Sequence, residues 1–500
     1  MLLFLPLLIP LLTIILLLAN SKKLRYQHFL SVTSVVAQLI VALLILKNVS
    51  LSGILVSQVG GWEAPAGITF LADYTSAILL LAVGIIAVIS IFYSIGFVDN
   101  VRQKGGLFIL YQGLLLGVNG SFLTADIFNL YVWFEVMLIS SFVLITLGAA
   151  KQQLRGSVKY LVMNLIGSSL FLAAIGLIYS QLGTLNMADI ALKLQQNGTT
   201  PLLNSALVLF FIAFGIKAAV FPFFFWLPAS YPTPPIAITA FFGATLTKVG
   251  VYVMLRFYSL FAYINEPYWQ PVIFAIAGLT MVFGALMAAS SYDIRKILSF
   301  HIISQIGYML MGIGLYSVVG LAGALFFVVH NMFSKTATFM AAGLIRQFQG
   351  SYDLRQLGGL YKAKPLLAFL FLIPALSLAG IPPTSGFFGK LFLLYAGFEA
   401  QDWAITIVAL VVSIITLFSM IKIWNEAAWK PVSEAVNLEK VSSKVNPIAL
   451  TASITITFLT LGLGITIFWT FDYFTEASRQ LLDNQLYIDA VLNRPNINLN

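Results

Sequence analysis

Residues 238–255 read ITAFFGATLTKVGVYVML, an apolar stretch with one lysine, Lys248, near its centre. No acidic residue lies within a helical turn of this lysine. Of the 500 residues in the chain, 60% are hydrophobic and 9% are charged. A soluble domain is nearer to about half apolar and a quarter charged. We therefore interpret the stretch as the middle of a membrane-spanning helix.

Similar apolar runs follow one another along the chain. Each is close to the length of about 20 residues that crosses a hydrocarbon core of roughly 30 Å. The runs are continuous rather than alternating, which argues against a β-barrel. They predict an all-α integral membrane protein of about fourteen transmembrane helices, at 2–19, 29–46, 70–97, 107–124, 127–148, 159–182, 204–228, 235–262, 271–290, 297–316, 318–345, 365–398, 403–425 and 447–469.

Basic residues predict the orientation of these helices. The first run has its positive charges after it, at Lys22, Lys23 and Arg25, whereas a cleaved signal peptide has them before the apolar segment. With the N-terminus outside, 18 basic residues fall in cytoplasmic loops, including those at 151–159 and 346–364. The outside segments hold five, namely Lys47, Lys193, Arg256, Arg479 and Arg494. Because positive residues favour the inside, we expect both termini to lie outside a cell membrane.

The composition also excludes several function classes. The chain has no cysteine, so it forms no disulfide and ligates no cluster through thiolates. The net charge of +9 is spread over short loops, which does not indicate nucleic-acid binding. No motif for nucleotide, metal or covalent catalysis is present. We therefore expect a membrane protein that is not an enzyme and holds no cofactor or metal.

Two of the runs contain helix-breaking residues. The segment 215–235 includes Pro222 and Pro228, and 378–394 includes Pro382 and Pro383. Interrupted helices at matching places in two halves are typical of transporters with inverted repeats. These are helices 7 and 12, which suggests two five-helix repeats spanning helices 4–8 and 9–13. The predicted division is 1–98 for helices 1–3, 106–262 and 271–425 for the repeats, 447–469 for helix 14, and 470–500 for a polar external tail.

Ionisable residues lie inside the predicted spans. They are Glu135 in helix 5, Lys217 in helix 7, Lys248 in helix 8, Lys390 in helix 12, and His330 with Lys335 in helix 11. Each charged group at the bilayer centre costs about 2.5–3.5 kcal/mol. Such residues must therefore face protein or water rather than lipid.

Structural explanations compete with a functional one for these residues. A lysine or arginine near a helix end extends to the interface, which is credible for Lys335 and preferred for Arg256. Both ends of helix 8 are too far from Lys248 for that explanation. Glu135 and Lys217 could form a static pair that only fixes packing.

The functional interpretation is a proton path. Burial disfavours the charged form of a lysine, a nearby carboxylate favours it, and the two together allow the ammonium to release and rebind a proton. A row of such groups with water between them can relay protons through lipid. His330, and His301 near the inner end of helix 10, are alternatively ordinary core histidines held by hydrogen bonds.

Several long motifs resemble those of a known family. The chain resembles the antiporter-like membrane subunits of respiratory complex I and of Mrp-type cation/proton antiporters over about helices 4 to 13, and most specifically the D-type Mrp subunit. The motifs are KAAVFPFFFWLPASYPTPPIAITAFFGATLTKVGVYVMLR at 217–256, DIRKILSFHIISQIGYMLMGIG at 293–314, HNMFSK at 330–335, DLRQLGGLYKAKP at 353–365 and GIPPTSGFFGKLFLL at 380–394.

The resemblance implies the fourteen-helix fold with broken helices 7 and 12. It implies proton-carrying roles for residues that match the family's positions: Glu135, Lys217, Lys248, His330 and Lys390. Two features depart from some relatives, namely Gln305 in place of a histidine and a spacing of five residues between His330 and Lys335. These departures concern the route near helices 10 and 11.

The resemblance further implies exchange of sodium for protons within an Mrp antiporter complex that also contains the A, B, C, E, F and G subunits, in contact with membrane lipids. The alternative is a proton-pumping subunit of complex I or of a membrane-bound hydrogenase. The row of lysines does not separate these two functions, but the sequence from Pro228 to Lys248 favours the Mrp type. A scaffold without a path of its own would not explain four central ionisable residues.

Overall fold

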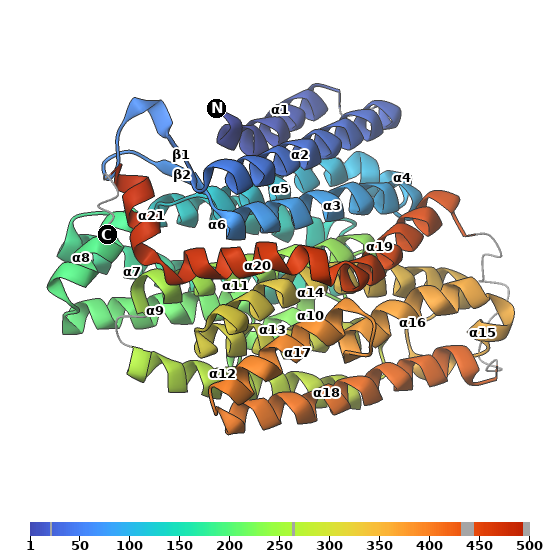
Figure 1. The fold of residues 1–500 in the computed structure, drawn as a ribbon. Coiled ribbons are helices and arrows are strands. Elements are labelled where there is room, and N and C mark those ends of the chain that lie inside the picture. Colours follow the sequence, from blue (N-terminus) through green and yellow to red (C-terminus); the bar gives the residue numbers. More distant parts are fainter. Residues whose placement is uncertain (21–22, 263–265, 432–444, 494–500) are drawn as a thin grey trace.

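The computed structural model describes residues 1–20, 23–262, 266–431 and 445–493, and these form a bundle of long helices that run roughly parallel and antiparallel (Figure 1). Lys22, Lys440, Lys444 and Arg494, which contribute to the predicted charge bias, lie outside the described residues. The principal helices are α1 (Leu5–Ala19), α2 (Leu24–Ser52), α3 (Tyr74–Phe97), α5 (Phe108–Leu123), α6 (Ile127–Thr146), α7 (Lys151–Leu182), α8 (Met187–Asn197), α9 (Pro201–Ala218), α10 (Trp226–Ser230), α11 (Ile236–Phe257), α12 (Glu266–Ser290), α13 (Ile294–Leu315), α14 (Val318–Gln349), α15 (Leu360–Ala363), α16 (Pro365–Ala379), α17 (Ser385–Glu399), α18 (Trp403–Trp424), α19 (Pro447–Ile465), α20 (Ile467–Leu482) and α21 (Asn484–Leu492).

The predicted all-α membrane fold is confirmed. Within the described ranges, 13 helical segments are long and apolar enough to cross a membrane, and α16 is a shorter apolar helix. The chain is therefore a multi-pass membrane protein. One feature is not helical, a hairpin of β1 (Leu55–Gln58) and β2 (Thr69–Ala72) between α2 and α3. We call the end of the bundle that carries this hairpin, α8 and α21 the hairpin end; α15 lies at the opposite end (Figure 1).

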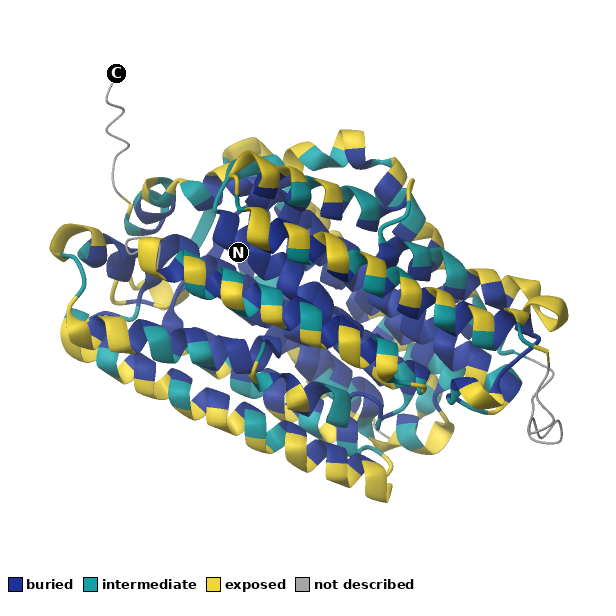
Figure 2. Cartoon of the chain, turned by 90° about the horizontal axis from the view of Figure 1, so that it is seen from below, coloured by how far each residue is buried: buried dark blue, intermediate teal, exposed yellow. Residues whose placement is uncertain are grey.

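The most deeply buried helices are α11, α13 and α14. Within their apolar windows, 100%, 94% and 89% of the residues are buried, against 39% for the peripheral helix α7. Exposed residues instead follow the outer faces of the peripheral helices (Figure 2). A helix that is apolar all round belongs inside a larger bundle, and these three helices accordingly form its core.

Both predicted helix breaks are present. The run at 204–228 is divided into α9 and α10, and the run at 365–398 into α16 and α17. The first break follows Ala219, whose φ of 59° is left-handed, and the second follows Gly380, whose φ is 90°. A left-handed residue ends an α-helix because the next amide turns back toward the last carbonyls. Accordingly, Val220 N–H donates to the Gly215 carbonyl at 3.0 Å, and Ile381 N–H donates to the Leu376 carbonyl at 3.1 Å.

Matched turns at the two ends of the bundle support the predicted inversion. An antiparallel bridge joins Asp126 to Asn186 in the first half, and another joins Asp293 to Asp353 in the second. All four side chains accept a hydrogen bond from a backbone N–H at the start of the following helix. The first bridge lies beside α8 and the second precedes α15, at opposite ends of the bundle (Figure 1). The repeat boundaries at 106–262 and 271–425 stay a prediction.

Some predicted boundaries differ from the structure. Helix 6 begins at Lys151 rather than 159, so residues 151–159 form its first turns instead of a loop. After α19, the expected polar tail is helical through α20 and α21 as far as Leu492. The low hydropathy of this segment conceals an apolar face, because Phe474, Ala477 and Leu481 are buried where α20 packs on α3 and α14.

Candidate ion-translocation site

Four lysines lie in the interior of the bundle. Lys217 and Lys390 are 5% and 4% exposed, and Lys248 and Lys335 are fully buried. Within the part of the chain that the structure describes, none of the four lies within ion-pair distance of a carboxylate. Each ammonium instead donates to a neutral oxygen. An ammonium in apolar surroundings without a carboxylate partner is costly, so the arrangement calls for a function.

Lys217 lies in the last turn of α9, directly before the helix break. Its Nζ donates to Ser168 Oγ of α7 at 3.0 Å and lies 4.7 Å from the centre of the Phe134 ring. The indole N–H of Trp226, beyond the break, donates to the Ile216 carbonyl at 2.9 Å. The Trp226 indole thus provides a donor for a carbonyl at the end of α9. Lys217 is not needed for this role and donates to Ser168 of the neighbouring helix instead.

Glu135 is placed differently from the lysines. It lies on α6 and is only half-buried, and its Oε1 has no hydrogen-bond partner among the described residues. It interacts electrostatically with Lys217 but makes no direct ion pair with it. The static Glu135–Lys217 pair considered from the sequence is therefore not formed as a contact.

Lys248 occupies the middle of α11. Its Nζ donates to the Gly243 carbonyl at 2.6 Å, and Thr247 Oγ1 lies 3.5 Å away. An ammonium has three donors, and these contacts satisfy at most two of them. The remaining capacity is available for a water molecule or for another member of a relay.

Lys335 does not extend to an interface, so the structural alternative considered for it is not what the structure shows. It lies in the middle of α14, which runs from Val318 to Gln349, and its Nζ donates to the Leu298 carbonyl of α13 at 3.2 Å. Its charge interacts with those of Lys248 and Lys390. Lys335 therefore lies within electrostatic range of the lysines of α11 and α17, without a direct contact to either.

His330 lies one turn before Ser334 on α14 and faces the second break. Its Nδ1 lies 2.8 Å from Ser385 Oγ of α17 and 3.5 Å from Ser377 Oγ of α16, so it bridges the two halves of the broken helix. Its Nε2 is buried without a partner among the described residues. A Cβ on Gly386 would lie 2.8 Å from His330 Cε1 and 1.8 Å from the Ser377 carbonyl oxygen, so only glycine allows this approach.

Lys390 follows the second break. Its Nζ donates to the Ala379 carbonyl, the last of α16, at 3.0 Å and lies 5.0 Å from the centre of the Tyr308 ring. The carbonyl end of a helix carries partial negative charge, which favours a cation there. Lys390 thus caps the C-terminal end of α16 although it belongs to α17.

Polar side chains without partners in the described ranges lie near these lysines on α13 and α14. Both amide atoms of Gln305 and of Asn331 are buried and unpaired, as is Nδ1 of His301. His301 Nε2 lies 2.6 Å from Ser419 Oγ of α18. Buried polar groups of this kind are where ordered water binds in proteins. Asn331 was not singled out from the sequence, although it adjoins His330 in the motif HNMFSK.

An ion pair was also missed. Arg256, expected to extend to the membrane surface, is 5% exposed, and its guanidinium pairs with Asp73, which is 1% exposed. Asp73 caps α3, where its carboxylate accepts from the Ser76 N–H at 2.9 Å. The sequence signal was an aspartate directly before an apolar run, which is typical of a helix start.

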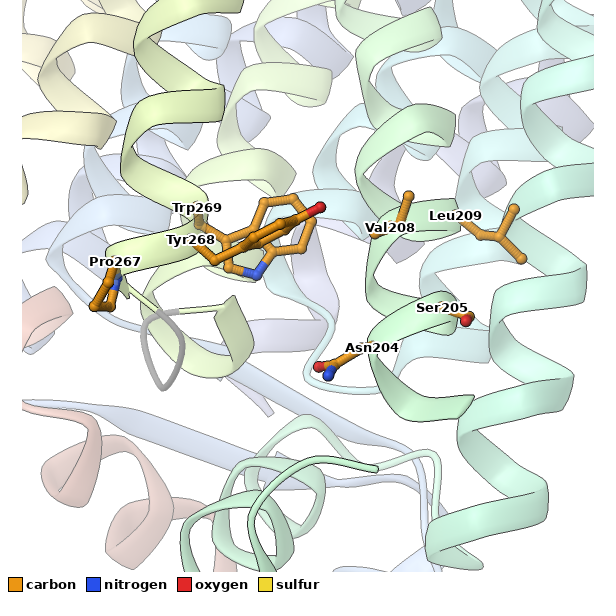
Figure 3. A pocket seen from close by; sticks show the side chains of 7 residues that line it. All are labelled: Asn204, Ser205, Val208, Leu209, Pro267, Tyr268 and Trp269. Carbon is orange, nitrogen blue, oxygen red and sulfur yellow. The ribbon is translucent and has the colours of Figure 1, made fainter. Parts of the chain in front are cut away.

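One surface groove lies away from these lysines. It separates the first turns of α9 and α12 and is lined by Asn204, Ser205, Val208, Tyr268 and Trp269, among others (Figure 3). No charged side chain lines it in the described part of the chain. We therefore assign it no part in moving ions.

Comparisons with known proteins identify the family of the chain. Residues 124–416 match the family model described as NADH:quinone oxidoreductase/Mrp antiporter, TM. The chain is 42% identical to the D subunit of a Na(+)/H(+) antiporter from Alkalihalophilus pseudofirmus, over 98% of this chain and 99% of that protein.

Two solved structures are similar over nearly the whole chain. A chain in the structure of the Mrp complex from Dietzia sp. is 30% identical with a TM-score of 0.91, over 98% of this chain and 99% of that one. A chain of the membrane-bound sulfane sulfur reductase, an archaeal respiratory membrane complex, is 25% identical with a TM-score of 0.89, over the same shares of 98% and 99%.

Proposed function

Because the chain belongs to the NADH:quinone oxidoreductase/Mrp antiporter family, we propose that it is the D-type component of a multi-subunit sodium/proton antiporter. It would lie in the cell membrane and relay protons along Glu135, Lys217, Lys248, Lys335, His330 and Lys390. The whole-length similarity to the D-type component of a Na(+)/H(+) antiporter supports the antiporter over a redox-driven pump. The likeness to the respiratory complex keeps the pump as the second candidate.

One observation carries the relay, namely that every buried lysine donates to a neutral oxygen. A carboxylate at contact distance would hold the ammonium charged, whereas a hydroxyl or carbonyl stabilises it far less. Burial disfavours the charged form of each lysine, so its proton can leave for a neighbour. The broken helices leave non-helical backbone beside two of the lysines, Lys217 and Lys390.

Substitution of Lys248 tests this mechanism. Lys248→Arg keeps a positive charge and can still donate to the Gly243 carbonyl, but arginine hardly ever releases its proton. We expect sodium-dependent proton flux in vesicles, per assembled complex, to fall about a hundredfold or more, the range for losing a proton-transfer group. Lys248→Ala should be equally inactive and assemble less well.

The matched control is Lys193→Arg, which alters a lysine that pairs with Asp189 at 3.1 Å and is partly exposed. It should transport at the native rate. If Lys248→Arg also runs near the native rate at every pH, titration of Lys248 has no part in the mechanism.

The orientation can be tested separately. The native sequence lacks cysteine, so single cysteines report position without background. We expect Lys362→Cys to react with a membrane-impermeant thiol reagent only after the cytoplasmic face is opened, and Lys47→Cys to react in intact cells. The reverse pattern would contradict the predicted orientation.

A further inference from the structure

The C-terminal segment 467–492 runs along α14 as α20 and reaches the hairpin end with the last turn of α20 and with α21 (Figure 1). Four polar contacts attach it. Ser478 Oγ donates to the Val318 carbonyl at 2.8 Å, at the start of α14, and Gln480 Oε1 accepts from the Tyr74 N–H at 3.0 Å, at the start of α3. Two further contacts come from α21: Asn484 Nδ2 donates to the Ser259 carbonyl at 2.7 Å, and the Tyr487 hydroxyl lies 3.9 Å from Met187 Sδ.

Beneath this segment lies the Arg256–Asp73 ion pair. The guanidinium carbon lies 5.3 Å from the centre of the Tyr487 ring and 5.5 Å from that of Tyr252. Tyr487 is 3% exposed and Asp73 is 1% exposed, so the pair is closed off from solvent in the chain as it stands. Removing either Arg256 or Asp73 would leave the other as an unpaired buried charge. The Tyr487 ring shields this pair from solvent.

Arg256 and Lys248 belong to one stripe of α11. Lys248, Tyr252 and Arg256 follow one another at intervals of four residues and so share a face of the helix. Eight residues at 1.5 Å each place Arg256 about 12 Å along the axis from Lys248. Water entering at this end would have only that distance to travel to reach the buried lysine. An arginine does not release its proton, so the stripe ends in a group that cannot pass one on.

From these contacts we propose that residues 478–492, the last turn of α20 and α21, seal the hairpin end of the proton row. Tyr487 covers the Arg256–Asp73 pair, and Arg256 acts as a positioning residue that holds Asp73 beneath this ring. This rests on the proposed proton relay. An antiporter that exchanges ions must not conduct protons freely, and a seal at one end of the row prevents such a leak. The contacts to α3, α11 and α14 hold together the ends of the helices that carry Lys248 and Lys335.

The test is proton leak through the whole complex in sodium-free vesicles, followed as the decay of an imposed pH gradient. Tyr487→Ala should accelerate the decay, by up to about thirtyfold if a whole desolvated cation–π contact is lost. Tyr487→Phe keeps the ring and should restore tightness. The matched control is Arg479→Gln, which removes a pair with Glu476 that is exposed at 64% and 42% in the same segment; it should not leak.

A double variant separates this inference from the proposed function. If the leak of Tyr487→Ala uses the row, adding Lys248→Ala should abolish it. A leak that survives the second substitution would overturn the seal while leaving the relay intact. Normal antiport by Lys248→Ala alone would instead overturn the relay. Arg256→Met should leak like Tyr487→Ala if it assembles; if Tyr487→Ala holds the gradient as the wild type does, the seal is wrong.

Discussion

The two broken helices end in the same backbone turn but use their lysines differently. At the first break, Lys217 precedes the turn and bonds sideways to Ser168, while the neutral indole of Trp226 donates to the helix end. At the second break, Lys390 follows the turn and itself donates to the Ala379 carbonyl. The comparison shows that the same left-handed turn can be combined with two roles for a lysine. Lys217 does not bond to the carbonyls of its helix end, whereas Lys390 caps the end of α16.

The largest expected effect is a difference in assembly between alanine variants of these two lysines. Lys217→Ala and Lys390→Ala should both abolish antiport, but only Lys390→Ala should also lower the yield of assembled complex. Its loss strands a buried carbonyl, at a cost of about 1–3 kcal/mol. The measurement is transport per assembled complex together with assembly on native gels.

A conservative variant sharpens this prediction. Lys390→Gln can still donate to the Ala379 carbonyl but cannot ionise, so assembly should return without transport. Transport by Lys390→Gln, or full assembly of Lys390→Ala, would show that the two roles are not combined in this lysine.

A smaller effect is expected at the left-handed residues. Gly380→Ala places a Cβ at a φ of 90° and 3.0 Å from Lys390 Cδ, so it should destabilise the complex by about 1–2 kcal/mol. The reciprocal change, Ala219→Gly, relieves a left-handed alanine but loses a buried methyl, and should be neutral within about 0.5 kcal/mol. Thermal unfolding of the solubilised complex measures the stability of both variants. Equal destabilisation by Gly380→Ala and Ala219→Gly would contradict this prediction.

An effect smaller than that of Gly380→Ala is expected at Trp226. Trp226→Phe removes the N–H that donates to the Ile216 carbonyl and keeps most of the ring, so stability should fall by about 1 kcal/mol. Because Lys217 bonds elsewhere, antiport should remain above about half of the native rate, a change of less than about 0.5 kcal/mol. A complete loss of transport would indicate that the indole positions the lysine after all.

The membrane fold, the helix breaks and the central ionisable residues could be predicted from the sequence, because they depend on local patterns. Run length and hydropathy identify the spans, and Pro222 and Pro382 mark the interruptions. Lys248 was recognisable because it lies too far from either helix end to reach water.

The remaining features depend on partners far away in the chain. Asp73 and Arg256 are 183 residues apart, and neither residue's neighbours reveal the other. The sequence placed Lys335 inside a span but left open whether it reaches an interface, because its acceptor, the Leu298 carbonyl, belongs to another helix. The average composition of α20 is polar enough to resemble an exposed tail. Averaging hides the apolar face of the helix, which packs on α3 and α14. Glu135 was placed in the correct helix, but its half-exposed position needed the fold.

The half-buried position of Glu135 has a consequence for the stability of the chain before it joins a complex. The same face of α6 carries Phe128, Val132 and Ile139, which are 45%, 39% and 64% exposed and suit contact with lipid. Glu135 Oε1 is buried beside them without a hydrogen-bond partner among the described residues, which costs a solitary chain about 2.5–3.5 kcal/mol in the bilayer. A neighbouring protein that offers it a donor removes this penalty. We therefore expect the chain to be less stable alone than in the assembled complex, and the carboxylate proposed to serve transport would then also favour assembly.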